Sequence, residues 1–462
     1  MDLQQRKLTK AEWNSIEVPV SSDEKRIIDL IKSGYNNIQI KKNYTLSLLQ
    51  YLKISYTDTI DAYVFTQYLQ DDIKSLSKKY GFDFTEIVAK KSMKKKDIIR
   101  FSNTDRQLEI NKGELFEYVL IAHLKKLYKY RSKESSKWLH HYYTITTLMN
   151  YNIEHSNVCL KKIISGLMEV LTEFVDMTSL ISMGHETIEC NSHLLHYADE
   201  SLYEHQKKLF TVCKKPKPKL ILYIAPTGTG KTLSPLGLSE GHRVIFVCAA
   251  RHVGLALAKA AISAQKKVAF AFGCSCTEDI RLHYYAVSEC IRNRRTGNIA
   301  KVDNSKGDKV EIMISDIRSY EYAMLYMRAF NKEENIILYW DEPTITMDYD
   351  KHEFHDIIKK NWTRNLIPNI VLSSATLPQK DEISDTIMDF KSKFDDSEIY
   401  TIISHDCKKT IPLINKEGFV EMPHFMFSDY EKILKVVAHC KRYKTLLRYI
   451  DLKESINFII YV

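Results

Sequence analysis

Glycine and proline are scarce in this chain of 462 residues, which has 14 and 10 of them, while Lys, Ile, Tyr and Asn are abundant. This bias is typical of AT-rich coding sequence and indicates nothing about mechanism. No apolar run approaches the roughly 20 residues that span a bilayer, and the opening letters MDLQQRKLTK lack the apolar core of a signal peptide. We therefore expect a soluble, intracellular protein with no membrane partner.

A disulfide framework is also absent from the sequence. The nine cysteines are an odd number and follow no regular spacing. Such usage is typical of reduced thiols in a reducing compartment. The nine are Cys159, Cys190, Cys213, Cys248, Cys274, Cys276, Cys290, Cys407 and Cys440.

The overall composition is that of a folded protein. Hydrophobic residues make up 44% of the chain and charged residues 27%, which excludes an intrinsically disordered protein. A length of 462 residues is too great for one core and predicts two or three domains. The net charge of +9 permits binding to a polyanion such as nucleic acid without requiring it.

The first 200 residues have mainly helical patterns. The letters TKAE (9–12) and SSDE (21–24) each place Glu three residues after Ser or Thr, which is the pattern of a capping box. Residues 114–130 and 159–175 carry apolar side chains at three- and four-residue spacing. We expect a mainly helical N-terminal domain over residues 1–199, in which no chemical motif occurs.

The pattern changes after KKPKPK (214–219), where two prolines among lysines predict a linker. Short apolar runs rich in Val, Ile and aromatic residues then alternate with helical segments such as 254–265 and 319–330. This alternation predicts a parallel sheet covered on both faces, in which ligands lie beyond the carboxyl ends of the strands. The runs span residues 220–226, 243–250, 267–272, 310–315, 335–342 and 369–376.

The first of these runs leads through Ala225 into PTGTGKT (226–232), which predicts a phosphate-binding loop. Gly228 and Gly230 can adopt positive φ and turn backbone N–H groups toward phosphate oxygens. Lys231 is placed to reach the β- and γ-phosphates and Thr232 to bind Mg²⁺. A plain glycine turn between strand and helix is the alternative, which the G-K-T letters disfavour. The nucleotide-binding candidates are Pro226, Thr227, Gly228, Thr229, Gly230, Lys231 and Thr232.

The helix after this loop would direct its positive end at the same anion. Pro235 and Gly237 come early in it, so we expect it to be short or kinked.

Downstream, the run at 335–342 ends in Asp341 and Glu342. A carboxylate at a strand end after a phosphate-binding loop is an expected Mg²⁺ ligand, and Glu342 could polarise the attacking water.

The run at 369–376 ends in small hydroxyl residues, among them Ser373, Ser374 and Thr376. These hydroxyls could hydrogen-bond to the acidic pair and report the state of the phosphates. They could instead cap a following helix, and the segment by itself favours the cap.

Together, A-P-T-G-T-G-K-T, D-E-P-T and S-A-T resemble motifs I, II and III of the superfamily 2 (DExD/H-type) helicases and translocases. That superfamily often has alanine at the first position of the loop, as Ala225 has here. The resemblance covers about residues 200–405 and implies a RecA-like lobe that binds ATP and Mg²⁺ and couples ATP hydrolysis to movement on, or remodelling of, DNA or RNA. It implies catalytic roles for Lys231, Asp341 and Glu342, Mg²⁺ binding by Thr232 and Asp341, and motif III coupling by Ser374, Ala375 and Thr376.

Further positions match the motifs of this superfamily less closely. Gln206 in YEHQKKLF (203–210) resembles the glutamine that recognises adenine in ATP. Residues 246–258 lie where motif Ia contacts the nucleic-acid backbone, and Arg251 is the candidate there although the usual Pro-Thr is missing. Ser315 and Asp316 match motif Ib weakly. The helical N-terminal region, the D-E-P-T variant and the composition are also similar to helicases of giant nucleocytoplasmic DNA viruses, which would place the protein in the host cytoplasm or the virion.

The resemblance also implies a second lobe whose Q-x-x-G-R-x-x-R-like arginines stabilise the transition state. No such pattern occurs in residues 379–462. We expect a longer chain or a partner protein to supply that lobe, because about 60 residues cannot form one. Residues 406–462 are expected to lead toward it. Within this tail the pattern predicts a strand at 398–404, a hairpin at 410–422, a helix from Ser428 to about Leu447 and a strand in INFIIYV (456–462).

For the isolated chain we therefore expect ATP binding and slow hydrolysis without directional unwinding. A second hypothesis is a non-motor nucleotide-binding module that docks a partner and does not turn over ATP. A P-loop kinase or GTPase is disfavoured, because D-E-P-T followed by S-A-T has no evident role there and no guanine-reading N-K-x-D follows the loop.

Two other clusters leave alternatives open. Cys274, Cys276, His283 and Cys290 could hold zinc, but C-x-C is not the usual spacing, and 279–287 between them predicts a helix, so buried thiols are favoured. The basic loop RNRRTGNIAK (292–301) could follow a phosphate backbone. Its nucleic-acid candidates are Arg292, Arg294 and Arg295.

Overall fold

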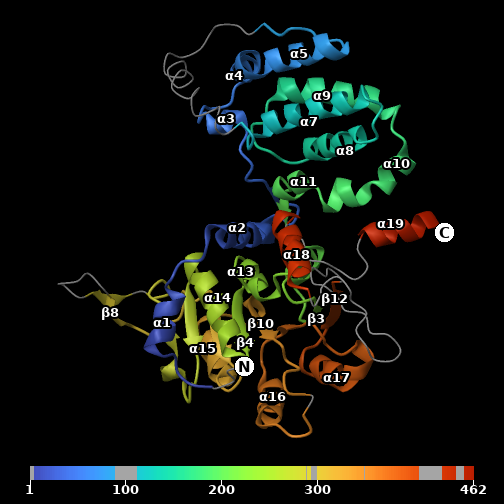
Figure 1. Ribbon diagram of the computed structural model, residues 1–462. Coiled ribbons are helices and arrows are strands. Elements are labelled where there is room, and N and C mark those ends of the chain that lie inside the picture. The colour runs from blue at the N-terminus through green and yellow to red at the C-terminus, as the bar shows by residue number, and fades with distance from the viewer. Residues whose placement is uncertain are drawn as a thin grey trace. The chain divides into compact units, whose positions relative to one another are not determined.

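The computed structural model describes residues 5–88, 112–287, 289–292, 299–347, 349–404, 429–443 and 452–461. The chain forms two compact units (Figure 1). The first, here called the sheet unit, comprises Met1–Ile40 and Ser201–Cys407. The second, here called the helical unit, comprises Lys41–Glu200 and Lys408–Val462.

The sheet unit is built on one eight-stranded sheet in the order β12-β3-β11-β10-β4-β9-β5-β6. All neighbouring strands run parallel except β5 and β6. This confirms the expected α/β lobe with a mainly parallel sheet. The strands are β3 (Lys219–Ile224), β4 (Arg243–Cys248), β5 (Val268–Ala271), β6 (Arg281–Leu282), β9 (Ile312–Asp316), β10 (Ile336–Asp341), β11 (Asn369–Ser374) and β12 (Glu398–Ile403).

Helices cover both faces of this sheet because successive strand residues point to opposite sides and both sides are apolar. In β3, Ile221 and Tyr223 belong to one hydrophobic cluster, and Leu220 and Leu222 belong to another. The first cluster includes residues of α1 (Lys10–Ile16), α2 (Ser22–Asn36), α12 (Glu204–Cys213), α13 (Ser234–Leu238) and α14 (Arg251–Ser263). The second includes residues of α15 (Tyr320–Phe330), α16 (Glu353–Arg364) and α17 (Ser384–Lys393).

Residues 5–40 pack on the sheet unit. Thr9 and Glu12 form the expected capping box at the start of α1, and the Ser21 side chain caps α2. Helix α1 contacts α14, and α2 contacts α13. This grouping was not anticipated by domain bounds at 1–199, 200–405 and 406–462, because a capping pattern defines where a helix begins and not which core it joins. Those bounds stay predictions.

The helical unit has its own core, formed by residues such as Phe65, Phe116 and Ile164. The expected helices at 114–130 and 159–175 are confirmed as α7 (Phe116–Arg131) and α9 (Val158–Thr172). Its other helices are α3 (Leu48–Tyr51), α4 (Asp58–Val64), α5 (Gln70–Tyr80), α8 (Trp138–Met149), α10 (Met177–Ser182), α11 (Ser192–His196), α18 (Tyr430–Tyr443) and α19 (Leu452–Tyr461), with π-helical turns at Phe65–Leu69 and His185–Glu189. The short strands β1 (Lys41–Lys42) and β2 (Glu200–Ser201) pair with each other.

Two predicted elements were wrong. In place of the strand expected in residues 456–462, residues 456–461 belong to helix α19 (Leu452–Tyr461), in which Ile456 is buried while Ile459 and Ile460 are exposed. The helix expected at 279–287 is instead the edge strand β6, which pairs with β5 and buries Leu282. The predicted hairpin at 410–422 lies outside the described residues, as do residues 444–447 of the helix expected from Ser428 to about Leu447, of which α18 covers Tyr430–Tyr443.

No helix within the described ranges has both the length and the apolar character needed to cross a membrane.

Candidate nucleotide site and strand-end surface

Three adjacent strands bring the predicted nucleotide residues together. Strand β11 lies between β3 and β10, with Ser374 paired to Ile224 and Ser373 paired to Asp341. Because the strands are parallel, their carboxyl ends meet at one edge of the sheet. The loop after β3, the acidic pair after β10 and the hydroxyl residues at the end of β11 therefore share that edge.

The loop after β3 has the backbone that a phosphate cradle requires. Gly228 has φ 86° and Gly230 has φ 79°, conformations that side chains with a Cβ rarely adopt. The Thr229 hydroxyl donates to the Pro226 carbonyl at 2.7 Å, which closes the loop. The backbone N–H of Ala225 donates to the Ser374 carbonyl at 3.3 Å. Alanine thus continues the pairing of β3 with β11 before the loop begins.

The segment that follows is short, as Pro235 predicts. Lys231–Leu233 form a 3₁₀ turn, and α13 has five residues, Ser234–Leu238. A helix of this length contributes little macrodipole, since that effect sums over aligned peptides. Anion binding here therefore depends on the loop amides and on Lys231. Thr232 lies in the 3₁₀ turn and is partly buried.

The Lys231 ammonium has the surroundings expected of a group prepared for an anion. The side chain is 6% exposed, and its Nζ has no hydrogen-bond partner. The nearest anionic atom is Glu342 Oε1 at 3.6 Å, an ion-pair distance rather than a hydrogen bond. A buried ammonium with unfilled donors is costly unless a ligand completes it. The oxygens of a polyphosphate fit this requirement.

Asp341 is the buried member of the acidic pair, with 6% exposure. Its burial, followed by the charge of Glu342, raises the pKa of Asp341 to about 7, against the opposing effects of Lys231 and Ser373. Among the described residues no group of three or more His, Cys, Asp or Glu could hold a metal. Asp341 and Thr232 could supply protein ligands to a Mg²⁺ ion whose remaining ligands were phosphate oxygens and water, which is usual for this ion.

Glu342 is fixed by contacts with the end of β11. Its φ of 49° is unusual for a residue with a side chain, and its N–H donates to the Ser373 carbonyl at 2.7 Å. The Ser374 hydroxyl donates to Glu342 Oε2 at 2.5 Å and accepts from the Thr376 N–H at 3.1 Å. Ala375 lies between these two residues.

Ser374 contacts Glu342, and the next regular element begins only at Lys380, so the segment does not cap a helix. Coupling of the acidic pair to the state of the phosphates by these hydroxyl residues stays a prediction.

Tyr339 is a site residue that the sequence patterns did not reveal. It lies on β10 and is fully buried, and its hydroxyl donates to the Lys231 carbonyl at 2.9 Å and lies 3.0 Å from Ser373 Oγ. It thereby ties the start of the 3₁₀ turn to the two neighbouring strands. The available signal was a tyrosine in a fully apolar run, because a buried hydroxyl needs a partner.

Gln206, on α12, contacts the phosphate loop. Its side-chain N–H donates to the Gly230 carbonyl at 3.4 Å, and its Oε1 accepts from the Tyr203 N–H at 3.2 Å. The side chain is 2% exposed. A Cβ on Gly230 would lie 2.9 Å from Gln206 Nε2, so glycine is required for this approach as well as for its φ. Recognition of adenine by Gln206 stays a prediction.

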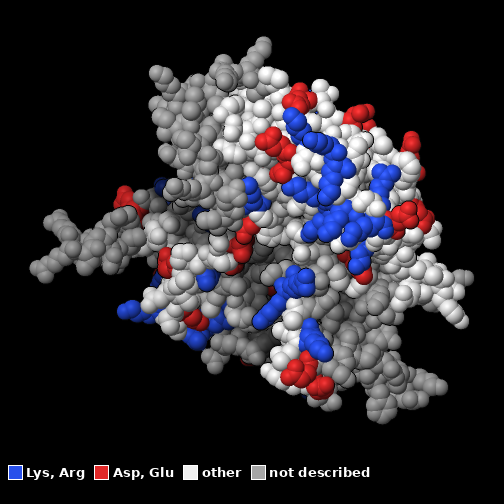
Figure 2. Space-filling view, turned by 45° about the horizontal axis from the view of Figure 1, so that its top comes forward, with Lys and Arg blue, Asp and Glu red and all other residues white. Residues whose placement is uncertain are grey.

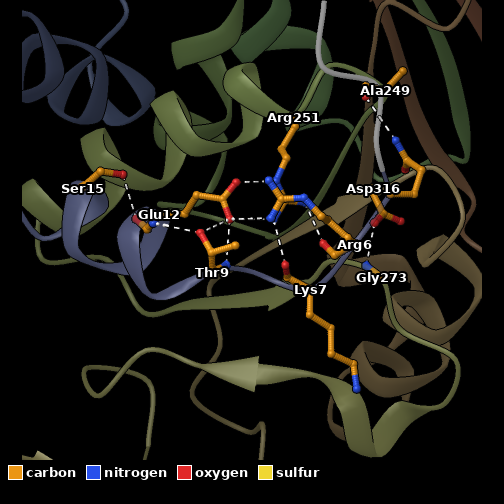
Figure 3. Close-up of polar contacts among 10 residues, drawn as sticks. Arg6, Lys7, Thr9, Glu12, Ser15, Ala249, Arg251, Gly273 and Asp316 are labelled. Carbon is orange, nitrogen blue, oxygen red and sulfur yellow. Dashed lines mark hydrogen bonds and ion pairs between the residues drawn. The ribbon is translucent and has the colours of Figure 1, made fainter.

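The other half of the same edge is formed by β4, β9 and β5, and Arg251 lies just beyond β4. Its guanidinium is 3% exposed and is held by Glu12 and by the carbonyls of Arg6 and Lys7 (Figure 3). The N-terminal segment thus covers the residue for which we predicted nucleic-acid contact. The predicted role requires that this segment move, and it stays a prediction.

The remaining sequence candidates are only partly described. Arg292 ends strand β7 (Cys290–Arg292), which pairs with β8 (Ile299–Val302), and Arg294 and Arg295 lie outside the described residues. Within the possible zinc cluster, Cys274 is buried and Cys276 exposed, while His283 Nε2 lies 2.9 Å from Glu17 Oε1. Burial raises the pKa of the Cys274 thiol to about 12, which disfavours the thiolate that zinc requires.

Positive charge gathers on part of the molecular surface. Figure 2 shows a concentration of Lys and Arg side chains on one region, with Asp and Glu more scattered around it. The whole chain has 67 basic and 58 acidic residues. A basic region of this kind favours contact with a polyanion in general and does not identify one.

No family model matches the chain, and no curated protein matches it in sequence. Solved structures do resemble it. One is a hypothetical ATP-dependent RNA helicase from Sulfolobus tokodaii, with 18% identity, a TM-score of 0.28 and coverage of 44% of this chain and 53% of that one. Another is the yeast DEAD-box splicing factor Prp28, with 14% identity, a TM-score of 0.28 and coverage of 56% of each chain.

A third similar structure is S. cerevisiae Dbp5 bound to Nup159, Gle1, IP6 and ADP, with 12% identity, a TM-score of 0.25 and coverage of 46% of this chain and 55% of that one. The chain spans about half the length of each of these proteins. At such TM-scores the likeness carries no functional argument, so function has to be argued from the side-chain geometry.

Proposed function

We propose that the sheet unit binds ATP with Mg²⁺ and hydrolyses it to move on or remodel nucleic acid, as one lobe of a superfamily 2-type motor. The observation that carries the proposal is Lys231, a buried ammonium without a hydrogen-bond partner, placed between a glycine loop with positive φ and an acidic pair. Such a site fits the phosphates of a nucleotide.

Each residue then has a separate task. Lys231 and the loop amides hold the phosphates, while Asp341 and Thr232 hold Mg²⁺, which neutralises charge on the phosphate oxygens. Glu342 orients a water molecule and accepts its proton. Ser374 holds Glu342 in place through the 2.5 Å hydrogen bond, which links motif III to the acidic pair.

The arginine that stabilises the transition state would come from a second lobe, in a longer chain or a partner protein. Slow basal hydrolysis by the 462 residues alone is the expected consequence. The narrower assignment to viral helicases stays a prediction from composition and motif variants.

The test is ATP binding and turnover with and without single-stranded DNA and RNA, in the chain alone and with a supplied second lobe. Lys231→Ala should weaken ATP binding by at least about tenfold, and Lys217→Ala, which alters an exposed lysine of the same unit, should not. Absence of Lys231-dependent nucleotide binding would refute the proposal. Strong nucleic-acid-stimulated turnover by the chain alone would show that no external lobe is needed.

The alternative is a nucleotide-binding interaction module that never turns over. The enclosure of Arg251 by the N-terminal segment favours it, because the strand-end surface is covered in this conformation. Nucleotide binding that depends on Lys231, with no hydrolysis even when a second lobe is supplied, would establish the alternative.

A further inference from the structure

Residues 5–17, here called the N-terminal strap, pass the residues that follow β4 and β5 and continue into α1, which packs on α14; Figure 3 shows Arg6, Lys7 and Glu12 of the strap around Arg251. Gln5 Nε2 donates to the carbonyl of Ala249, the residue after β4, at 3.3 Å. Lys7 Nζ lies 2.5 Å from Asp279 Oδ1, and Glu17 Oε1 lies 2.9 Å from His283 Nε2. Gln5 and Lys7 therefore lie at this half of the edge, whereas Glu17 reaches His283, which pairs with Val268 at the opposite end of β5.

Arg251 takes all its described hydrogen-bond acceptors from the strap. Its Nε and Nη2 donate to the two carboxylate oxygens of Glu12 at 2.6 and 2.9 Å, and Nη1 and Nη2 donate to the carbonyls of Arg6 and Lys7 at 2.7 and 3.1 Å. The guanidinium also lies over the Phe272 ring at 5.0 Å. Arg251 is therefore a buried guanidinium of the sheet unit whose described acceptors all come from one short segment.

Glu12 is the anionic centre of this arrangement. Its hydrogen bond with Arg251 lowers the pKa of Glu12 to about 2, against the opposing effect of burial, so the carboxylate is charged at neutral pH. The bidentate geometry is the one that a guanidinium forms equally well with a carboxylate or a phosphate. Glu12 therefore holds the position that a phosphate group would take on Arg251.

Gly273, after β5, permits the close approach of the strap backbone. Its φ is 59°, and a Cβ at this position would lie 2.5 Å from the Arg6 carbonyl carbon and from the Lys7 N atom. Its N–H donates to Asp316 Oδ2 at 2.6 Å, which fixes the loop against the end of β9. A surface that holds one extended backbone against a glycine and an arginine can hold a different extended chain in its place.

The two ends of the strap are held by different kinds of contact. Its helix α1 is held by apolar contacts, with Ile16 buried and the Trp13 ring packed edge-on to Phe270 at a centroid distance of 4.9 Å. Gln5, Arg6 and Lys7 are held by hydrogen bonds, and the partly buried Leu8 adds the apolar contact of this segment. Polar contacts exchange with water or a competing ligand at a lower cost than buried apolar ones. Residues 5–12 can therefore leave the surface by unwinding the first turn of α1, while Trp13 and Ile16 remain docked.

Resting on the function proposed above, we propose that residues 5–12 are an intramolecular competitor for nucleic acid, in which Glu12 occupies on Arg251 the place of a backbone phosphate. Binding of a single strand requires the strap to leave the ends of β4, β9 and β5. While the strap is in place it covers this surface, so the resting chain binds nucleic acid weakly.

The test compares Glu12→Gln in the full chain with the unaltered protein and with Glu24→Gln, which removes the same charge from an exposed position on α2. Binding of fluorescein-labelled single-stranded RNA and DNA oligonucleotides is measured by anisotropy over a range of salt concentrations. Glu12→Gln should bind roughly tenfold more tightly, which corresponds to about 1.4 kcal/mol. Glu24→Gln should bind like the unaltered chain.

Adding Arg251→Ala to Glu12→Gln should remove the gain and reduce the salt slope by about one phosphate contact. A measurement on the unaltered chain is independent of how any variant folds: hydrogen exchange of residues 5–12 should accelerate when the oligonucleotide is added. Equal affinities of Glu12→Gln and the unaltered chain, with unchanged exchange of residues 5–12, would overturn the inference and show the strap to be a structural clasp.

Failure of the inference and failure of the proposed function give different results. If oligonucleotides bind, depend on Arg251 and leave the strap in place, only the competition is wrong. If no variant binds either oligonucleotide while a fluorescent ATP analogue still binds through Lys231, the nucleic-acid part of the proposed function is wrong and the inference falls with it.

Discussion

Ser374 Oγ lies 2.5 Å from Glu342 Oε2, so the end of β11 holds the residue that follows β10. A hydrogen bond to a charged group is worth about 1.5–3 kcal/mol. We predict that Ser374→Ala lowers kcat for ATP hydrolysis roughly tenfold to a hundredfold and leaves the Kd for ATP within about threefold, because Ser374 positions Glu342 and does not hold the phosphates. Ser392→Ala, on the exposed side of α17, is the matched hydroxyl deletion. An equal loss in Kd would contradict this role.

Lys231 and Glu342 are expected to separate binding from chemistry. Lys231→Ala should raise the Kd for a fluorescent ATP analogue by at least about tenfold, because an anion loses its buried ammonium partner. Glu342→Gln should keep the hydrogen bond from Ser374 and retain binding, while single-turnover hydrolysis falls by about 10²–10⁴. Stopped-flow binding and phosphate-release assays measure the two steps. Hydrolysis at the normal rate in Glu342→Gln would exclude it as the general base.

Tyr339→Phe should destabilise the turn that carries Lys231. Removal of the hydroxyl deletes its hydrogen bonds to Lys231 and Ser373, although the Lys231 carbonyl keeps the Ser234 N–H and the Ser373 hydroxyl keeps Asp341, so the loss should cost about 0.5–1.5 kcal/mol of unfolding free energy. The Kd for ATP should also rise severalfold, since the turn that carries Lys231 loses its tie to β10. Tyr223→Phe, on the neighbouring strand β3, removes an equally buried hydroxyl that contacts His205 and Ser234. A comparable rise in Kd for both variants would show a general loss of stability rather than a local effect.

Acid should destabilise the helical unit through its histidines. Burial, followed by neighbouring His193 and His141, lowers the pKa of His123 to about 2, and burial followed by His140 lowers the pKa of His141 to about 3. The unfolded chain protonates these side chains near pH 6.5, whereas the folded chain keeps them neutral. Stability is therefore full above pH 6.5 and declines below it, by up to about 1.4 kcal/mol per pH unit for each histidine.

Denaturant unfolding between pH 7.5 and 5.5 measures this slope above the range in which carboxylates with ordinary pKa values titrate. His123→Leu should flatten the curve relative to the unaltered chain, although its stability at pH 7.5 is lower because Nδ1 of His141 loses its partner at 3.0 Å. Exposed His155 provides a control, and His155→Gln should leave the slope unchanged. A slope that is the same in His123→Leu would show that other groups cause the acid sensitivity.

The sequence predicted most of the sheet because each central strand is a continuous apolar run, which can be stable only when both faces are covered. The runs at β3, β4, β10 and β11 were therefore recognisable, and so were the polar residues at their carboxyl ends. The same reasoning failed for residues 279–287, where a two-residue edge strand is too short to show alternation. It also failed for 456–462, where a short apolar run fits either a strand or a helix.

Amino-acid order alone determined the phosphate loop, because only glycine adopts the φ of Gly228 and Gly230 without strain. It also determined that the acidic pair and the hydroxyl residues follow strands. Tertiary structure alone decided that Ser374 contacts Glu342 across two strands and that Tyr339 supports Lys231. It decided likewise that Glu12 closes over Arg251 from 239 residues away in the chain. Periodicity records which face of an element is apolar, whereas these pairings depend on strand order and on which core a helix joins.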